Sequence, residues 1–130
     1  MAACLVDLKD LDWETWDDPQ LRANSAVRWK LVFSSDRTPT DTMSMGLAEI
    51  AVGGVLPLHH HEPAEIYHVL EGHIRVSVAG VEHMLHPGQL FFIPPDVPHS
   101  TVNAGPIPAR ILFVFPVGSF DDVAYHFMPQ

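Results

Sequence analysis

Short runs of β-branched and aromatic residues make up the chain from Ala26 onward, and Gly, Pro and Asp separate these runs at close intervals. No helical period of useful length appears beyond residue 25. This pattern of short runs and turn residues is typical of an antiparallel sandwich or barrel, so the expected fold class is all-β. Strands are expected over 26–34, 44–52, 55–61, 64–71, 73–79, 81–85, 89–93, 99–103 and 109–116.

The first part of the chain has a different character. Trp13, Trp16 and Pro19 stand among scattered acidic residues, which predicts a short helix or irregular segment whose indoles cover one end of the core. A length of 130 residues is enough for one core but too small for two. We therefore expect a single domain over 1–130, with an appendage at 1–24, a barrel at 26–116 and a tail at 117–130.

Charge and hydropathy exclude several classes of protein. Sixteen acidic residues stand against seven basic ones, with no cluster of Lys or Arg, so nucleic acid is not expected as a partner. Apolar runs such as 111–117 are too short to span a bilayer. The first ten residues do not resemble a secretory signal, and Cys4 is the only cysteine. These features predict a cytoplasmic protein without an internal disulfide.

The segment 53–65 carries the strongest chemical signal. His59 and His61 are two residues apart on an expected strand, so they face the same side, while His60 faces the other. After the turn at Glu62 and Pro63, Glu65 begins the next strand, where hairpin pairing brings its carboxylate beside the two imidazoles.

A fourth donor follows the proline-rich loop 94–98. His99 comes directly after this rigid loop, which can deliver an imidazole at little cost in entropy. Three nitrogens and one carboxylate suit one divalent transition metal ion, namely iron, manganese, nickel or zinc. A six-coordinate ion would keep two positions open for substrate or water. The alternative is a barrel whose histidines hold no ion.

These residues fit the two sequence motifs of the cupin superfamily, which the chain resembles. The first motif is matched at every spacing by Gly53, His59, His61, Glu65 and Gly72. The second is matched by Gly88, Pro94, His99 and Asn103, with Asp96 where the motif has glycine. The resemblance implies a jelly-roll barrel, also called a double-stranded β-helix, with the metal inside its wider end.

Two tyrosines are candidates for chemistry beside the ion. Tyr67 is two residues after Glu65, so its phenol faces the same side, and a nearby dication would move it toward a useful base. Tyr67 could equally be a core residue. Tyr125, on the tail, could fold back over the mouth of the barrel, or it could serve only for packing. His68 and His73 are expected outside the metal shell.

Other aromatic and basic residues have simpler interpretations. Core packing is expected of most of the aromatic residues in the strands, although one ring could line the pocket and meet a ligand cation. The residues concerned are Trp29, Phe91, Phe92, Phe113 and Phe115. Arg75 and Arg110 are expected to point to solvent.

A narrower resemblance is to the small cupin lyases of marine bacteria that cleave dimethylsulfoniopropionate. The segments that carry it are 27–30, 46–51 with Gly53 and Gly54, 58–67, and Tyr125. The resemblance implies that His59, His61, Glu65 and His99 hold the metal and that the metal binds the substrate carboxylate. It also implies that Tyr67 removes the α-proton and that Tyr125 is a second pocket hydroxyl. The products would be dimethyl sulfide and acrylate.

Segments 73–86 and 104–112 share only the general barrel pattern with those lyases. A different metal-cupin enzyme, a dioxygenase or an isomerase, therefore stays open, as does a non-catalytic cupin that binds a small molecule. The same His and Glu ligands accept several first-row ions. We expect a homodimer that protects the edge of the strand at 27–33.

Overall fold

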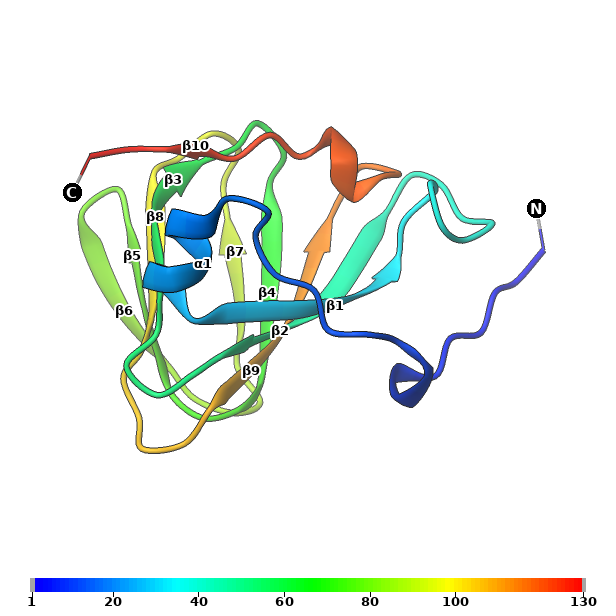
Figure 1. Cartoon of the computed structure of the whole chain (residues 1–130). Coiled ribbons are helices and arrows are strands. Elements are labelled where there is room, and N and C mark those ends of the chain that lie inside the picture. The colour runs from blue at the N-terminus through cyan, green and yellow to red at the C-terminus, as the bar shows by residue number, and fades with distance from the viewer. Residues whose placement is uncertain (1, 130) are drawn as a thin grey trace.

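Two five-stranded antiparallel sheets face each other in the computed structural model, which describes residues 2–129 (Figure 1). The first sheet has the strand order β1-β2-β9-β4-β7 and the second has the order β10-β3-β8-β5-β6. The strands are β1 (Val27–Phe33), β2 (Ser44–Ile50), β3 (Val55–His60), β4 (Glu65–Glu71), β5 (Ile74–Val78), β6 (Val81–Leu85), β7 (Leu90–Ile93), β8 (His99–Asn103), β9 (Ala109–Phe115) and β10 (His126–Phe127).

These strands confirm the all-β prediction. Each range expected from the sequence contains one strand, and only the short β10 is additional. Consecutive strands in the chain alternate between the sheets at several points, which makes the arrangement a jelly roll rather than a simple meander. None of the described helices is long and apolar enough to cross a membrane.

The appendage contains one α-helix and one 3-10 turn, η1 (Leu8–Asp10). The helix α1 (Pro19–Ser25) begins because Asp18 caps it, with its carboxylate accepting hydrogen bonds from the backbone of Gln20 and Leu21. Proline is favoured at the first helical position, where its missing N–H costs nothing. Ala26 ends the helix in the left-handed conformation, with φ of 55°.

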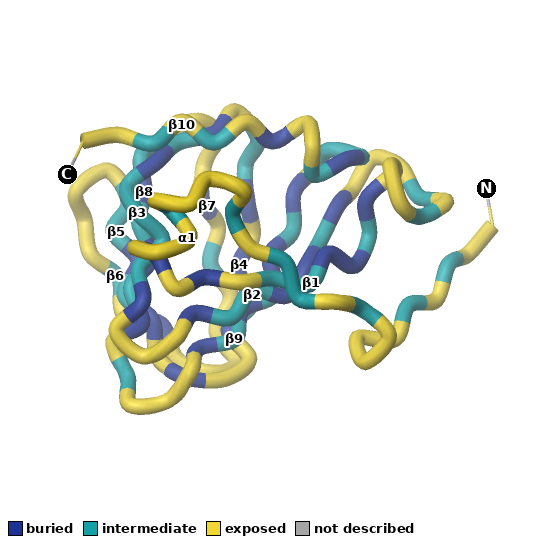
Figure 2. The backbone as a smooth tube through the Cα atoms, in the orientation of Figure 1, coloured by how far each residue is buried: buried dark blue, intermediate teal, exposed yellow. Residues whose placement is uncertain are grey.

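The core follows the alternation of the strands. Along β9, the residues Ala109, Ile111, Phe113 and Phe115 are buried, and the residues between them are half-buried. Figure 2 shows this alternation as dark segments along the strands that enclose the interior. Side chains of one parity therefore build the interior and the site within it.

The two N-terminal indoles lie in different places, which partly corrects the prediction. Trp16 covers one end of the core, where its ring lies 4.9 Å from that of Trp29. Trp13 instead lies on the outside, under the guanidinium of Arg28 at 4.0 Å. Cation–π attraction explains this position, since three basic groups lie within 6 Å of the Trp13 ring, namely those of Arg28, Lys30 and Arg110.

The edge of β1 is partly covered by the chain itself. Glu14 and Trp29 exchange two backbone hydrogen bonds, of 2.7 and 2.9 Å, so the appendage pairs with this edge at one point. The homodimer stays a prediction.

On the first sheet, Phe92 is 60% exposed, so the packing role expected for it is wrong. It has the outward parity of β7, whereas Ile93 beside it is fully buried.

Candidate metal centre

Three histidines from different parts of the chain converge inside the barrel. His59 lies near the end of β3, His61 follows that strand, and His99 is the first residue of β8. One ring nitrogen from each lies within 4.8 Å of the others, and all three side chains are buried. The antiparallel register of β3 and β8 pairs His59 directly with His99. This arrangement can hold a single metal ion.

The Nδ1 atom of each ring is bound to a backbone carbonyl. His59 Nδ1 donates to the carbonyl of Pro57 at 2.7 Å, His61 Nδ1 to that of Pro63 at 2.8 Å, and His99 Nδ1 to that of Val97 at 2.9 Å. A hydrogen bond at Nδ1 selects the tautomer whose Nε2 carries a lone pair and also fixes the orientation of the ring. The protein thus prepares three Nε2 atoms as ligands.

Two of these nitrogens are otherwise unexplained. His59 Nε2 and His99 Nε2 are buried and have no hydrogen-bond partner among the described residues. A buried polar atom without a partner is costly and uncommon in native proteins. A metal ion would satisfy both atoms at once, so the donor set fits the metal that the sequence predicts.

Glu65, the first residue of β4, supplies the carboxylate. Its Oε1 lies 3.2 Å from His61 Nε2 and 3.6 Å from His99 Nε2, and its side chain is 4% exposed. Burial raises the pKa of Glu65, but the hydrogen bond from His61 and the adjacent His99 outweigh it and hold this pKa below its usual value. The structure thus brings together all four residues that the sequence predicted as ligands.

His59 and His61 differ in protonation when no ion is bound. Burial and the neighbouring His99 lower the pKa of His59 to about 3, so its ring is neutral at physiological pH. Burial also acts to lower the pKa of His61, but the hydrogen bond and the charge of Glu65 raise it above the usual value. Because His61 donates from both ring nitrogens, it is the residue that holds a proton in place of a metal.

His60 points away from the site, as its parity predicts. Its Nδ1 donates to Asp96 Oδ1 at 2.7 Å. Asp96 stands where the second motif has glycine, and it adopts the left-handed backbone, with φ of 59°. The backbone N–H of Asp96 donates to the carbonyl of His61 at 2.8 Å, so this strained turn holds the His61 segment in place.

An apolar cavity of about 40 Å³ adjoins Glu65. Tyr67 lines it, fully buried as predicted, with its hydroxyl 3.1 Å from Thr101 Oγ1. Burial and the charge of Glu65 raise the pKa of Tyr67 well above its usual value. Among the described residues no Lys or Arg lines this cavity, and its walls are mostly aromatic and aliphatic.

The tail folds back over the cavity. The ring of Tyr125 stacks on that of His59, with centroids 5.0 Å apart and planes inclined by 26°. It also lies 5.6 Å from the Trp16 ring. Burial and the charge of Glu65 raise the pKa of Tyr125 as well. The tail and the appendage therefore close the same end of the barrel (Figure 1).

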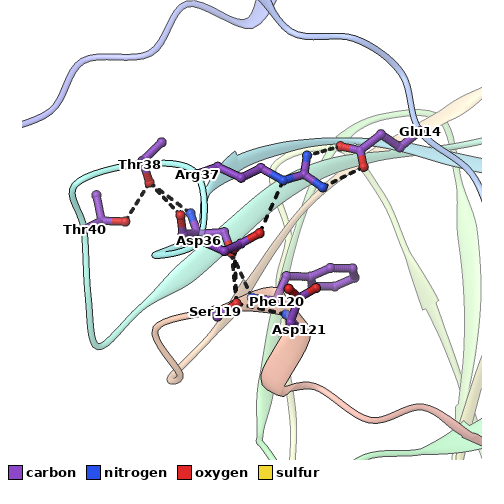
Figure 3. A network of polar contacts seen from close by, with 9 residues as sticks. Glu14, Asp36, Arg37, Thr38, Thr40, Ser119, Phe120 and Asp121 are labelled. Atoms are coloured by element: carbon purple, nitrogen blue, oxygen red, sulfur yellow. Dashed lines mark hydrogen bonds and ion pairs between the residues drawn. The ribbon is translucent and has the colours of Figure 1, made fainter.

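A polar network anchors the start of this tail (Figure 3). Ser34 Oγ accepts a hydrogen bond from the Phe120 N–H at 3.0 Å, and Ser119 Oγ donates to Asp36 at 3.1 Å. Arg37 forms an ion pair with Glu14 of the appendage. These contacts join the loop after β1 to the tail and to the appendage. They also position the Phe120 ring in the lining of the cavity.

Sequence reasoning did not single out Trp16 and Phe120 as part of the cavity lining, or Thr101 as the hydrogen-bond partner of Tyr67. Thr101 had a usable signal, because it lies two residues after His99 on the same strand and so shares its inward face. Trp16 and Phe120 had none, because long-range packing brings them to the cavity.

His68 and His73 lie outside the triad, as expected. Arg75 and Arg110 pair with Glu82 and Glu49 on the surface.

Comparison with known proteins agrees with this geometry. Residues 46–115 match the family described as the cupin domain. The chain is 37% identical over 101 residues to dimethylsulfoniopropionate lyase DddW of Ruegeria pomeroyi, which covers 78% of this chain and 66% of that protein. The chain spans 35% to 66% of the length of the curated relatives that it matches.

Solved structures share the fold. The polyketide cyclase RemF from Streptomyces resistomycificus superposes with a TM-score of 0.80 at 21% identity, covering 99% of this chain and 87% of that one. Oxalate oxidase in complex with glycolate superposes with a TM-score of 0.60 at 25% identity, covering 66% of this chain and 46% of that one. The matched residues and the shared fold establish that this chain belongs to the cupin domain family.

Proposed function

We propose that this chain is a metal-dependent carbon–sulfur lyase that cleaves dimethylsulfoniopropionate to dimethyl sulfide and acrylate. The observation that carries the proposal is that Tyr67 and Glu65 both line an apolar cavity, while Glu65 also lies beside two histidines of the triad. The relationship to the lyase DddW supports the choice of reaction. We propose His59, His61, Glu65 and His99 as the ligands of one divalent transition metal ion.

A bound divalent ion would supply Lewis acidity, holding a substrate carboxylate, acidifying the carbon beside it and favouring the phenolate of Tyr67. The cavity has no basic lining residue among the described residues, so the protein offers a carboxylate no cationic side chain there. Trp29, Phe113 and Phe120 instead present aromatic rings to the cavity. Such rings attract a sulfonium cation without requiring hydrogen bonds from it.

Tyr67 acts as the base in this proposal. With an ion bound beside it, the Tyr67 hydroxyl would release its proton to solvent water, and Thr101 Oγ1 at 3.1 Å would stabilise the resulting phenolate by donating a hydrogen bond. The phenolate then takes the α-proton of the substrate, and the electron pair of that C–H bond forms the carbon–carbon double bond. The carbon–sulfur bond breaks as its electron pair leaves on sulfur, so neutral dimethyl sulfide departs and acrylate remains.

Tyr125 is proposed as a second pocket hydroxyl that orients the substrate. The cavity holds only about 40 Å³ with Tyr125 stacked on His59, which is room for a few water molecules. A substrate of this class is larger, so it must displace the Tyr125 ring on entry. The short β10 pairs His126 with His60 and Phe127 with His59, and the Met128 N–H donates to the Leu58 carbonyl at 2.9 Å. So short a pairing would let this part of the tail move.

The test is release of dimethyl sulfide into the headspace by protein loaded separately with iron, manganese, nickel or zinc. Metal-dependent release that is lost in His99→Ala supports the proposal. No release with any ion would overturn the lyase assignment. Oxygen uptake dependent on ferrous iron would favour an oxygenase on the same site.

A further inference from the structure

Two histidines meet on the surface at the opposite end of the barrel from the triad. His73 lies in the turn between β4 and β5, and His86 lies in the turn between β6 and β7. Their Nδ1 atoms are 3.2 Å apart, with ring centroids 4.8 Å apart and planes inclined by 84°. Both residues are exposed. The barrel chemistry described above uses neither of them.

We propose that His73 and His86 form a second, surface metal site that chelates a borderline first-row divalent ion such as Ni²⁺, Cu²⁺ or Zn²⁺. Imidazole nitrogen bound to such ions lies about 2.0–2.1 Å from the metal. Two nitrogens at the observed separation would then subtend roughly 100° at a shared ion, between the octahedral and tetrahedral angles. Water would complete the coordination.

The backbone of both residues is held in place. The His73 carbonyl accepts a hydrogen bond from Ala104 at 3.0 Å. The His86 N–H donates to Gln89 Oε1 at 2.8 Å, and its carbonyl accepts from the Gln89 N–H at 3.1 Å. Because the two turns are already fixed, binding an ion requires only rotation of two exposed rings, at a small cost in entropy.

In the metal-free structure the two rings share one hydrogen bond. One Nδ1 donates to the other, so the two lone pairs do not both face the shared position. Each exposed ring can carry its proton on Nε2 instead, toward solvent. Both Nδ1 lone pairs are then free for a metal, and the formal charge of -9 on the chain favours cation uptake.

This site is remote from the triad. Glu65 is the first residue of β4 and Glu71, just before the turn that holds His73, is the last, a span of about 20 Å at the usual rise of a strand. Figure 1 shows the two turns at the end of the barrel away from β10. The two sites therefore bind independently, and total metal content can exceed one ion per chain without any change at the triad.

The test is calorimetric titration of Ni²⁺ into protein whose buried site has first been loaded and whose excess metal has been removed. One further Ni²⁺ per chain is expected, bound at least 10-fold more weakly in His73→Ala and in His86→Ala. His68→Ala, a histidine in the middle of β4, serves as the matched control and should keep the second event. Circular dichroism checks that the variants are folded.

Thermal unfolding provides an independent readout. Ni²⁺ should raise the melting temperature of the loaded parent protein further, because an ion that bridges the two turns binds only the folded state. His73→Ala should lose this increment and His68→Ala should retain it. Absence of a second binding event, or a second event unchanged in both His73→Ala and His86→Ala, would overturn the proposal.

Discussion

The ring of Tyr125 stacks on the ring of His59, with centroids 5.0 Å apart and planes inclined by 26°. A residue near the end of the chain thereby contacts a proposed metal ligand more than sixty positions away in the sequence. The contact depends on two anchors, the pairing of β10 with β3 and the network of Ser34 and Asp36 at the start of the tail (Figure 3). Access to the cavity thus depends on the tail.

Two substitutions of Tyr125 distinguish the contribution of its ring from that of its hydroxyl. Tyr125→Phe keeps the stack, so the free energy of unfolding should change by less than about 1 kcal/mol, while kcat/KM falls about 10-fold or more with the lost hydrogen bond to substrate. Tyr125→Ala also removes the ring and should destabilise the fold by about 3 kcal/mol. Denaturant unfolding and steady-state kinetics measure the two effects. An unchanged kcat/KM in Tyr125→Phe would contradict a role for the hydroxyl and show that Tyr125 serves only for packing.

Metal affinity should rise between pH 6 and pH 8. The proton on His61 occupies a ligand atom, and because the pKa of His61 is raised, this proton competes with the metal as the pH falls. His59, with a pKa of about 3, is neutral across the whole window and adds no competition there. Competition with a chelator of known affinity at each pH measures the effect. An affinity independent of pH would contradict this assignment of the proton.

Substitution of Asp96 should reveal backbone strain. Both Asp96→Ala and Asp96→Gly lose the hydrogen bond from His60, but only glycine adopts a φ of 59° at no steric cost. Asp96→Gly should therefore be the more stable variant by about 1 kcal/mol. Denaturant unfolding of the two proteins compares them directly, and equal stabilities would show that the turn is unstrained.

Asn103 should matter for stability although it lies outside the metal site. Its Nδ2 donates to the carbonyls of Ile50 at 3.0 Å and Ile107 at 2.8 Å, and its Oδ1 accepts from the Gly105 N–H at 2.9 Å. Asn103→Ala leaves buried backbone groups unpaired and should cost about 2–4 kcal/mol of unfolding free energy. The exposed Asn24→Ala serves as the control, and a similar loss in both variants would refute this role.

Local patterns in the sequence predicted much of this molecule. The parity of His59, His60 and His61, and the start of a strand at Glu65, follow from the two-residue period of strands and from turn chemistry. The motif spacing placed His99 and Asn103 on β8. These features depend on neighbours within a few residues, which is why sequence alone carries them.

Contacts between distant segments were not predictable in the same way. The pairing of Glu14 with Trp29, the position of Phe120 on the cavity and the meeting of His73 with His86 each join residues that no local period relates. Trp13 illustrates the difficulty, since its sequence neighbourhood matches that of Trp16 yet its ring lies outside the barrel. Tertiary packing decided these cases.

Turnover by Tyr67→Phe, measured together with its metal content, tests the central claim most directly. The substitution keeps the ring and leaves Glu65 and the three histidines in place, so the metal-to-protein ratio should equal that of the parent protein. Loss of the base should lower dimethyl sulfide release by at least about 100-fold. Release within about twofold of the parent protein, at equal metal content, would contradict the role of Tyr67 as the base.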